Sequence, residues 1–312
     1  MPDLILLFIA LAGLWVGSEL VINAARAIAR HYRVSDLFIG LTLVAFGTDL
    51  PELFIDITAA FQRLNGIETS GLIIGQTIGS SFGQIALVLG IVALAGTISI
   101  RKKRLYRDGL MMIIAVVLVF LLGLDGMLSQ IDGLILVASY IFYIATIFRE
   151  ERALNGVRKI PMDRLWSFVS IISGFAILIY ASQLTVTSAL SISEHFGISQ
   201  SLIGLFIVGL GTSLPELATS LNAVRRNAGQ LAIGNLIGST TFDLLLTLGI
   251  GSAISGFLVS RDILIFDMPA LFVVSLLVIG LFAMKGKLNK KEALLLIGVY
   301  ILYFILKVFI VF

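Results

Sequence analysis

The hexapeptide GTDLPE at residues 47–52 returns later in the chain as GTSLPE at residues 211–216. Each copy places a glycine, a proline and a carboxylate within a stretch that is apolar enough to cross a lipid bilayer. Proline removes a backbone donor and disrupts the preceding helical turn, and an ionised glutamate inside hydrocarbon is energetically costly. Because both copies share these costly features at matched positions, the sequence predicts two related halves with a cation site between them.

The composition places the chain among polytopic membrane proteins. Hydrophobic residues make up 58% of the 312 residues and the mean hydropathy is +1.06, which is more apolar surface than a soluble domain of this size buries. Cysteine is absent, which excludes disulfides and thiolate metal sites, and two histidines are too few for a typical His-rich metal site. No Walker A pattern is present, so ATP is not the expected energy source.

Ten segments are long and apolar enough to cross a bilayer, which takes about 20 residues. They are residues 3–26, 36–62, 70–96, 106–123, 128–148, 165–190, 200–223, 229–257, 263–284 and 291–311. Of the 22 Lys and Arg residues, 19 lie in the stretches that follow odd-numbered segments. By the positive-inside rule these loops are cytoplasmic, so both termini are expected on the outside of the plasma membrane. The N-terminal segment lacks the features of a cleaved signal and is interpreted as a retained helix.

The two halves of the chain carry matching motifs in the same order, so segments 1–5 are expected to match segments 6–10. The hexapeptides are offset by 164 residues, and GQTIGS at residues 75–80 resembles GNLIGS at residues 234–239. Five segments per half is an odd number, so the halves enter the membrane in opposite directions, as in many secondary transporters. The predicted organisation is a first repeat over 1–149, a short cytoplasmic linker over 150–164 and a second repeat over 165–312.

The second, third, seventh and eighth segments are expected to break near the membrane midplane. Gly47 and Pro51 should split the second segment and free backbone carbonyls, and the seventh segment offers the Gly209 carbonyl. Lipid cannot satisfy such groups, so they must face protein, water or an ion. In the third and eighth segments the break is expected at the sequences GQTIGS and GNLIGS.

The candidate ligands on these four segments are all oxygen donors, which prefer hard cations such as Ca²⁺ and Na⁺. They are the carboxylates of Glu52, Glu216, Asp243 and Asp49, the hydroxyls of Thr48, Thr212, Ser213, Ser80 and Ser239, the Gln84 amide and the carbonyls of Ala45 and Gly209. Four converging carboxylates would repel one another unless they were protonated or neutralised by cations.

Three further acidic residues are interpreted on less specific grounds. Asp56 lies one turn after Glu52 and is either a ligand in a vestibule or a solvated residue at a helix end. Glu19, which is matched by Gln183 in the second half, is a candidate for the ion path. Asp267 is interpreted as a solvated residue near a membrane surface.

The repeated motifs resemble those of the cation/Ca²⁺ exchanger superfamily, especially the prokaryotic sodium/calcium exchangers with their two α-repeats. The resemblance implies an all-α integral membrane fold of ten transmembrane helices in two inverted five-helix repeats, with helices 2, 3, 7 and 8 broken near the midplane. It also implies antiport of Na⁺ and Ca²⁺ by alternating access, with Glu52 and Glu216 as central Ca²⁺ ligands and Asp243 completing the cluster. The ligands that it implies mainly for Na⁺ are Thr48, Thr212, Ser213, Ser80, Ser239 and the carbonyls of Ala45 and Gly209.

Three departures from the family pattern leave the coupling ion open. Asp49 stands where the family usually has Ser, Gln76 replaces the motif Asn, and Gln84 occupies the place opposite Asp243 where Asn is common. The extra carboxylate of Asp49 favours either stronger cation binding or an H⁺/Ca²⁺ or K⁺-dependent exchanger as the alternative. A cation channel is less favoured, because channels need no inverted repeat. An enzyme is not expected, since no nucleophile is paired with a base; the expected partners are the transported ions and the bilayer, with no cofactor, nucleic acid or required protein partner.

Overall fold

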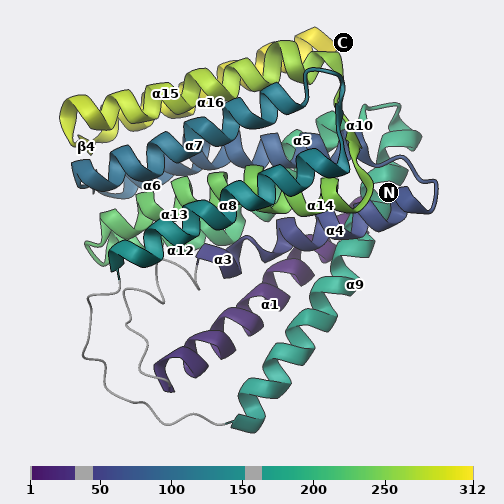
Figure 1. Ribbon diagram of the computed structural model, residues 1–312, viewed down its shortest axis with the longest axis horizontal. Coiled ribbons are helices and arrows are strands. Elements are labelled where there is room, and N and C mark those ends of the chain that lie inside the picture. The colour runs from purple at the N-terminus through teal and green to yellow at the C-terminus, as the bar shows by residue number, and fades with distance from the viewer. Residues whose placement is uncertain (1, 32–44, 152–163, 312) are drawn as a thin grey trace.

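The computed structural model describes residues 2–31, 45–151 and 164–311, and most of these residues are helical (Figure 1). The first half contains α1 (Pro2–His31), α3 (Ala45–Thr48), α4 (Leu50–Leu64), α5 (Ser70–Phe82), the π-helical segment η2 (Gly83–Val88), α6 (Leu89–Ala95), α7 (Lys102–Leu122) and α8 (Gln130–Glu151). The second half contains α9 (Arg164–Phe196), α10 (Gln200–Ile203), η3 (Gly204–Val208), α11 (Gly209–Thr212), α12 (Leu214–Arg225), α13 (Gly229–Phe242), η4 (Asp243–Thr247), α14 (Leu248–Ser255), η5 (Ile263–Asp267), α15 (Met268–Lys285) and α16 (Lys290–Val311).

In the part of the chain that the structure describes, nine helical stretches are long and apolar enough to cross a membrane. They correspond to nine of the ten predicted segments. The tenth, residues 36–62, is described only from residue 45 onward, as α3 and α4. Most of the predicted linker, residues 152–163, also lies outside the described residues.

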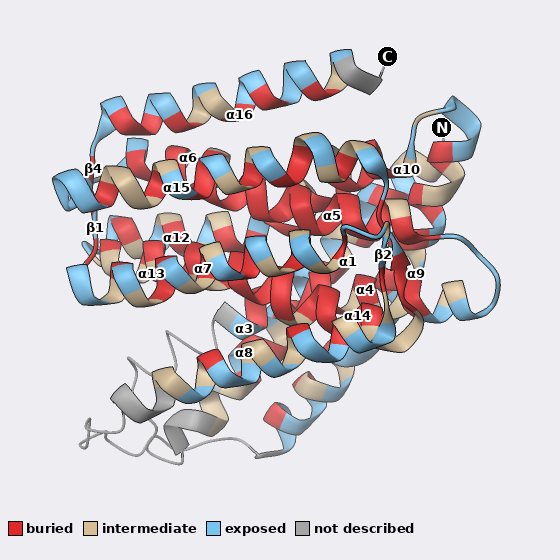
Figure 2. Ribbon diagram, turned by 45° about the horizontal axis from the view of Figure 1, so that its top comes forward, coloured by how far each residue is buried: buried red, intermediate tan, exposed pale blue. Residues whose placement is uncertain are grey.

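The helices form a layered body and a separate slanting pair. The long helices α1 and α9 pack along each other and lean away from the remaining helices, which stack in layers (Figure 1). In that body the last helix of each half packs on the other half, α8 on α14 and α16 on α6. The buried residues concentrate on the helices at the centre of the layers, including α5 (Figure 2).

Four two-residue strands tie the loops together, a feature that the sequence did not reveal. Strand β1 (Ile98–Ser99) pairs with β4 (Lys287–Leu288), and β2 (Met127–Leu128) pairs with β3 (Phe257–Leu258), both antiparallel. The pairing joins the loop after the third segment to that after the ninth, and the loop after the fourth to that after the eighth. Each pair must lie on one side of the membrane, which agrees with the predicted alternation of the segments.

The second and seventh helices are interrupted where the repeated hexapeptides predict it. Asp49 separates α3 from α4, and Ser213 separates α11 from α12, with nearly identical backbone angles of φ −84°, ψ 1° and φ −79°, ψ 1°. Pro51 and Pro215 follow as the second residue of the new helix, where a missing N–H costs nothing. The carbonyl of Gly47, four residues before Pro51, instead accepts a hydrogen bond of 2.7 Å from the Ser18 hydroxyl of α1.

The third and eighth helices are interrupted differently from the prediction. The helices α5 and α13 continue through the GQTIGS and GNLIGS sequences, and the α-helical pattern gives way about one turn later, to η2 at Gly83 and to η4 at Asp243. The reason in α5 is close packing: a Cβ atom at Gly75 or Gly79 would overlap backbone of the α10–η3 region. Such π-helical insertions often occur at functional sites, because they re-aim the side chains that follow.

The prediction that Asp267 is solvated is wrong. Asp267 is fully buried and accepts hydrogen bonds from the Tyr303 hydroxyl at 2.8 Å and from Lys307 Nζ at 2.5 Å. Lys307, also fully buried, donates a second bond of 2.7 Å to Asp262. Burial is possible because α16 brings a cation from 40 residues farther along the chain, a pairing that sequence spacing does not reveal.

Candidate cation site

Two glutamates occupy the first turn of the helices that begin after the breaks. Glu52 follows Pro51 in α4, Glu216 follows Pro215 in α12, and both side chains are fully buried. The first turn of a helix has unpaired N–H groups and the positive end of the helix dipole, which favour a negative charge. The hexapeptides therefore place two carboxylates at equivalent positions inside the protein.

The four interrupted helices meet at the hydroxyl of Ser80 in α5. Ser80 Oγ lies 2.7 Å from an Asp243 carboxylate oxygen and 3.5 Å from a Glu52 carboxylate oxygen. The Ser213 hydroxyl lies 3.3 Å from it, and the Gln84 amide donates to it at 3.0 Å. One buried serine thus links the second, third, seventh and eighth helices, as the sequence predicted for this set of residues.

Gln84 orients the Asp243 carboxylate from the opposite half. Its Nε2 lies 3.1 Å from Asp243 Oδ2, and its Oε1 accepts a bond of 3.0 Å from the Thr240 hydroxyl. Thr240 therefore fixes which end of the Gln84 amide faces the carboxylate. In the sequence Thr240 belongs to the run of hydroxyl residues beside Ser239, and its contact with Gln84 of the other half becomes apparent only in the fold.

Hydroxyl side chains from each half of the chain lie beside carboxylates of the other half. The Thr212 side chain lies beside the Glu52 carboxylate, and the Thr48 side chain lies beside that of Glu216. Ser239, from α13, lies beside Asp49. Each half therefore contributes hydroxyl oxygens to a carboxylate of the other half, as two inverted repeats facing each other require.

The carboxylates of the site have few partners. Both carboxylate oxygens of Asp49, Asp56 and Glu216, one each of Glu52 and Asp243, and the Ser239 hydroxyl are buried without a hydrogen-bond partner. Within the described residues, no Lys, Arg or His forms an ion pair with these groups. Burying an ionised carboxylate without a partner is strongly unfavourable. The arrangement therefore needs positive charge from solution, as cations or protons.

The acidic groups of the site interact with one another across the interrupted helices. In the described part of the chain, no group of three or more His, Asp or Glu side chains is arranged to hold one metal ion. Asp49, Glu52, Glu216 and Asp243 nevertheless lie close enough to interact electrostatically. Ca²⁺ accepts six to eight oxygen ligands, including hydroxyl and carbonyl oxygens. Hydroxyl and carbonyl oxygens of the same helices are therefore needed beside the carboxylates to complete a Ca²⁺ shell.

Gly209 and Asp56 differ from the roles that the sequence predicted for them. The Gly209 carbonyl is already an acceptor, for the Ser213 hydroxyl at 2.8 Å and the Thr212 hydroxyl at 3.2 Å, so an ion there would have to displace them. Asp56 is fully buried, so the solvated role at a helix end is wrong. Ala45, the other residue with a predicted carbonyl ligand, is the first residue of α3.

Comparison with known proteins places these features in a known family. A family model described as sodium/calcium exchanger protein matches residues 3–149 and 166–309. An uncharacterized membrane protein of Methanocaldococcus jannaschii is 34% identical over 93% of this chain and 92% of its own. The sodium/calcium exchanger MaX1 of Methanosarcina acetivorans is 28% identical over 97% of each chain. A solved structure of the sodium–calcium exchanger NCX_Mj, soaked with Na⁺ and Sr²⁺, is 31% identical over 96% of each chain and superposes with a TM-score of 0.68.

Proposed function

Because this chain belongs to the sodium/calcium exchanger protein family, we propose that it exchanges Na⁺ for Ca²⁺ across the membrane by alternating access. The observation that carries the proposal is the group of buried, partnerless carboxylate oxygens where the four interrupted helices meet. A solute of positive charge and small size, bound through oxygen, is the cargo that such a group selects. The proposal involves no catalytic residue and no cofactor.

The residues of the site divide by charge. Glu52 and Glu216 are the central Ca²⁺ ligands in this proposal, with Asp243 oriented toward them by Ser80 and Gln84. The neutral oxygens complete the shells of Na⁺ ions on either side; they are those of Thr48, Thr212, Ser213, Ser80, Ser239 and the carbonyls of Ala45 and Gly209. Asp49 lies in the same group and adds a fourth negative charge.

Coupling follows from competition for the same carboxylates. Na⁺ and Ca²⁺ cannot both be fully coordinated when each needs Glu52 and Glu216. With no cation bound, the carboxylates repel one another and resist being closed off from water. The empty protein therefore resists the change of access, and exchange is favoured over a one-way leak.

The moving part in this proposal is the slanting pair of helices. The helices α1 and α9 are unbroken, pack mainly on each other and lean away from the layered body (Figure 1). Sliding of this pair across the body would open the site to one side of the membrane and then to the other.

The chain is organised in two repeats, over 1–149 and 165–312, which are joined by the linker 150–164. The charge distribution supports a plasma-membrane orientation with both termini outside.

A second candidate is H⁺/Ca²⁺ or K⁺-dependent exchange. Asp49 is the observation that favours it, since it is buried with both oxygens partnerless at a position where the family usually has Ser. A carboxylate there takes up a proton, which a serine hydroxyl does not do at neutral pH, and its negative charge attracts a further cation.

Radioactive Ca²⁺ uptake into proteoliposomes separates these functions. The vesicles are loaded in turn with Na⁺, K⁺ or an inert organic cation, with and without a pH gradient. Uptake only into Na⁺-loaded vesicles is the expected result. Uptake driven by acid-loaded vesicles in the absence of Na⁺ would replace the proposal with H⁺/Ca²⁺ exchange, and a requirement for K⁺ would add K⁺ to the cycle.

A further inference from the structure

Asp56 of α4 is a fully buried aspartate, and neither of its carboxylate oxygens has a hydrogen-bond partner. It lies one helical turn after Glu52, toward the end of α4 that the charge distribution places outside the membrane. Asp56 is not among the Na⁺ and Ca²⁺ ligands proposed above. Burying an ionised carboxylate without a counter-charge is strongly unfavourable, so the position of Asp56 calls for an explanation.

Arg63, the basic residue of α4, is engaged elsewhere. It lies about two helical turns beyond Asp56. Its Nη1 donates to the Ser70 hydroxyl at 2.9 Å and to the Gly256 carbonyl at 3.2 Å, and its Nη2 lies 3.7 Å from a Glu68 carboxylate oxygen. Arg63 is therefore the counter-charge of Glu68, and in the described part of the chain no Lys, Arg or His pairs with Asp56.

The elements around Asp56 are described over their whole length. Helix α4 packs on α5, α9, η4 and α14, and α5 is covered in turn by α10 and η3. Figure 2 shows α4 and α14 next to each other within the buried part of the molecule. A Cβ atom at Gly251 of α14 would lie 3.4 Å from the Asp56 Cβ. Asp56 is thus enclosed by described helices, and its oxygens face their side chains.

Thr247 of η4 offers a neutral oxygen to Asp56. Its side chain lies beside Asp56, and its hydroxyl donates a hydrogen bond of 2.8 Å to the backbone carbonyl of Asp243. A hydroxyl group has one hydrogen to donate and two lone pairs. Because the hydrogen is used by the Asp243 carbonyl, the hydroxyl presents only lone pairs to its other neighbours. A carboxylate and an acceptor oxygen side by side suit a cation.

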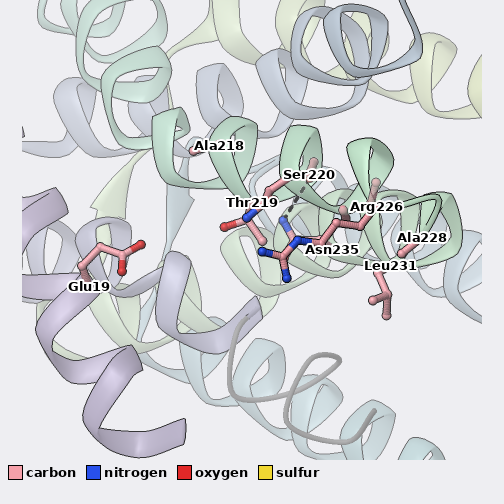
Figure 3. Close-up of a pocket in the computed structure, with 11 residues that line it drawn as sticks. Glu19, Ala218, Thr219, Ser220, Arg226, Ala228, Leu231 and Asn235 are labelled. Carbon is pink, nitrogen blue, oxygen red and sulfur yellow. Dashed lines mark hydrogen bonds between the residues drawn. The ribbon is translucent and has the colours of Figure 1, made fainter. Parts of the chain in front are cut away.

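Gln76 of α5 offers a second neutral oxygen. It is fully buried, and neither atom of its amide group has a hydrogen-bond partner. Its match in the second half is Asn235, whose amide nitrogen lies 3.4 Å from the Ser220 hydroxyl (Figure 3). Ser220 is in turn the match of Asp56, so the repeat directs Gln76 toward Asp56. A buried amide without a protein partner is rare and is satisfied by water or an ion.

We propose that Asp56, Thr247 and Gln76 form a further cation site, which binds one Na⁺ between the central carboxylates and the outside. This inference rests on the proposed function and orientation. The three oxygen donors are hard ligands that suit Na⁺. Because an unbalanced buried charge is strongly unfavourable, a single carboxylate is matched by a monovalent cation. Asp56 also interacts electrostatically with Asp243, so a cation here reduces the repulsion between the two aspartates.

The site is not repeated in the other half of the chain. Ser220 stands at the position that matches Asp56, and Val88 stands at the position that matches Thr247. The matched positions therefore lack both the charge and one of the neutral oxygens. Because α4 leads toward the outside, the additional site raises Na⁺ affinity on that side of the membrane.

Equilibrium binding of radioactive Na⁺ tests the site without transport. In the purified variant E52Q/E216Q, which lacks the central glutamates, adding D56N should lower the Na⁺ bound at saturation by a single ion per protein. D56S, which introduces the residue of the matched position, should have the same effect. The matched control D56S/S220D restores the charge in the other half and should not restore the ion, because Val88 offers no oxygen there. Equal Na⁺ binding with and without Asp56 would overturn the proposal.

A transport measurement separates this inference from the proposed function. In right-side-out vesicles the half-saturating external Na⁺ concentration for Ca²⁺ efflux should rise about 10-fold in D56N, because a charge beside a buried cation is removed. T247V keeps the charge and should raise it about 3-fold. Failure of the proposed function would abolish Na⁺-driven Ca²⁺ flux in the wild-type protein, whereas failure of this inference would leave D56N with wild-type half-saturation. A D56N protein with unchanged Na⁺ dependence but altered pH dependence would assign a proton to Asp56 and overturn the Na⁺ site.

Discussion

Two groups of acidic residues in the described part of this membrane protein differ in where their positive charge comes from. In the first, the buried Asp267 and the partly exposed Asp262 are bonded to Lys307, a buried cation that belongs to the chain. In the second, at the cation site, the carboxylate oxygens are largely without partners among the described residues. The first group is complete as it stands, whereas the second requires a cation that it can also release.

The complete group has a counterpart in the first half of the chain. Asp108 of α7 accepts a hydrogen bond of 3.1 Å from Tyr143 of α8 and pairs with Arg107 at 2.7 Å. Asp267 and Tyr303 repeat this arrangement in the second half, with offsets of 159 and 160 residues. The repeats therefore share a structural anchor as well as the candidate ion ligands.

The anchor in the second half also supports the cation site. The Tyr303 ring stacks on Phe82, with ring centroids 4.0 Å apart. Phe82 directly precedes η2, the segment that carries Gln84. The comparison shows that burial of an acidic residue alone does not single out a candidate ion site, because Asp267 is buried with a cation of the chain whereas Glu216 is buried without one.

The largest expected effect is loss of transport when a central carboxylate is neutralised. Glu52→Gln or Glu216→Gln should weaken Ca²⁺ binding by roughly 3 kcal/mol, which is about 100-fold. The fold should remain intact, because the change removes a partnerless buried charge. Ca²⁺ flux and the thermal unfolding temperature in detergent check both statements. Full transport in both variants would refute the assignment of the two glutamates.

Removing the built-in cation should damage stability rather than ion binding. Lys307→Met leaves Asp267 buried without its counter-charge and should cost about 3–5 kcal/mol. The double variant Lys307→Met/Asp267→Asn should recover much of this loss. Unfolding in denaturant measures the cost, and Ca²⁺ binding by the folded protein is the control. A Lys307→Met protein with normal stability but weaker Ca²⁺ binding would show that the two groups are not distinct.

A smaller effect is expected at the serine where the four helices meet. Ser80→Ala removes a hydrogen bond of 2.7 Å to Asp243 and a weaker contact with Glu52. A hydrogen bond to a charged group contributes about 1.5–3 kcal/mol, so Ca²⁺ affinity should fall roughly 10-fold or more. Ser81→Ala, at the neighbouring buried position, is the matched control. Equal affinities for the two variants would remove Ser80 from the site.

The smallest effect concerns the residue that departs from the family. Asp49→Ser should lower Ca²⁺ affinity about 3-fold through the lost charge. It should also make uptake less sensitive to external pH, because one proton-binding group has gone. Asp49→Asn removes the charge but keeps the size of the side chain, so it distinguishes the effect of the lost charge from that of the smaller side chain. Unchanged pH dependence in both variants would leave Asp49 without a role in coupling.

The sequence predicted the features that arise locally and missed those that depend on long-range packing. The breaks at Asp49 and Ser213 were predictable because proline acts on its own helix turn. The interruptions at Gly83 and Asp243 were misplaced, because the glycines before Gly83 serve contact with a distant helix. Asp267 was misinterpreted for the same reason, since its partner Lys307 lies 40 residues away.

Within the cation site, the sequence predicted the residue types better than their partners. Glu52, Asp243 and Ser80 were predicted to belong to one site, and in the structure the Ser80 hydroxyl lies 3.5 Å from Glu52 and 2.7 Å from Asp243. The motif spacing did not predict that the Ser213 hydroxyl donates a hydrogen bond to the Gly209 carbonyl, because this bond depends on the backbone conformation at the helix break. The buried position of Asp56 likewise depends on its packing beside Gly251 of α14.

Competition between Na⁺ and Ca²⁺ at equilibrium tests the central claim most directly. Purified protein is saturated with radioactive Ca²⁺ and titrated with Na⁺ at constant ionic strength. If the partnerless carboxylates are the exchange site, Na⁺ should displace all bound Ca²⁺ with a steep concentration dependence, and Lys307→Met/Asp267→Asn should behave like the wild type. Ca²⁺ that stays bound at saturating Na⁺ would contradict the account, because the two ions would then not share these carboxylates.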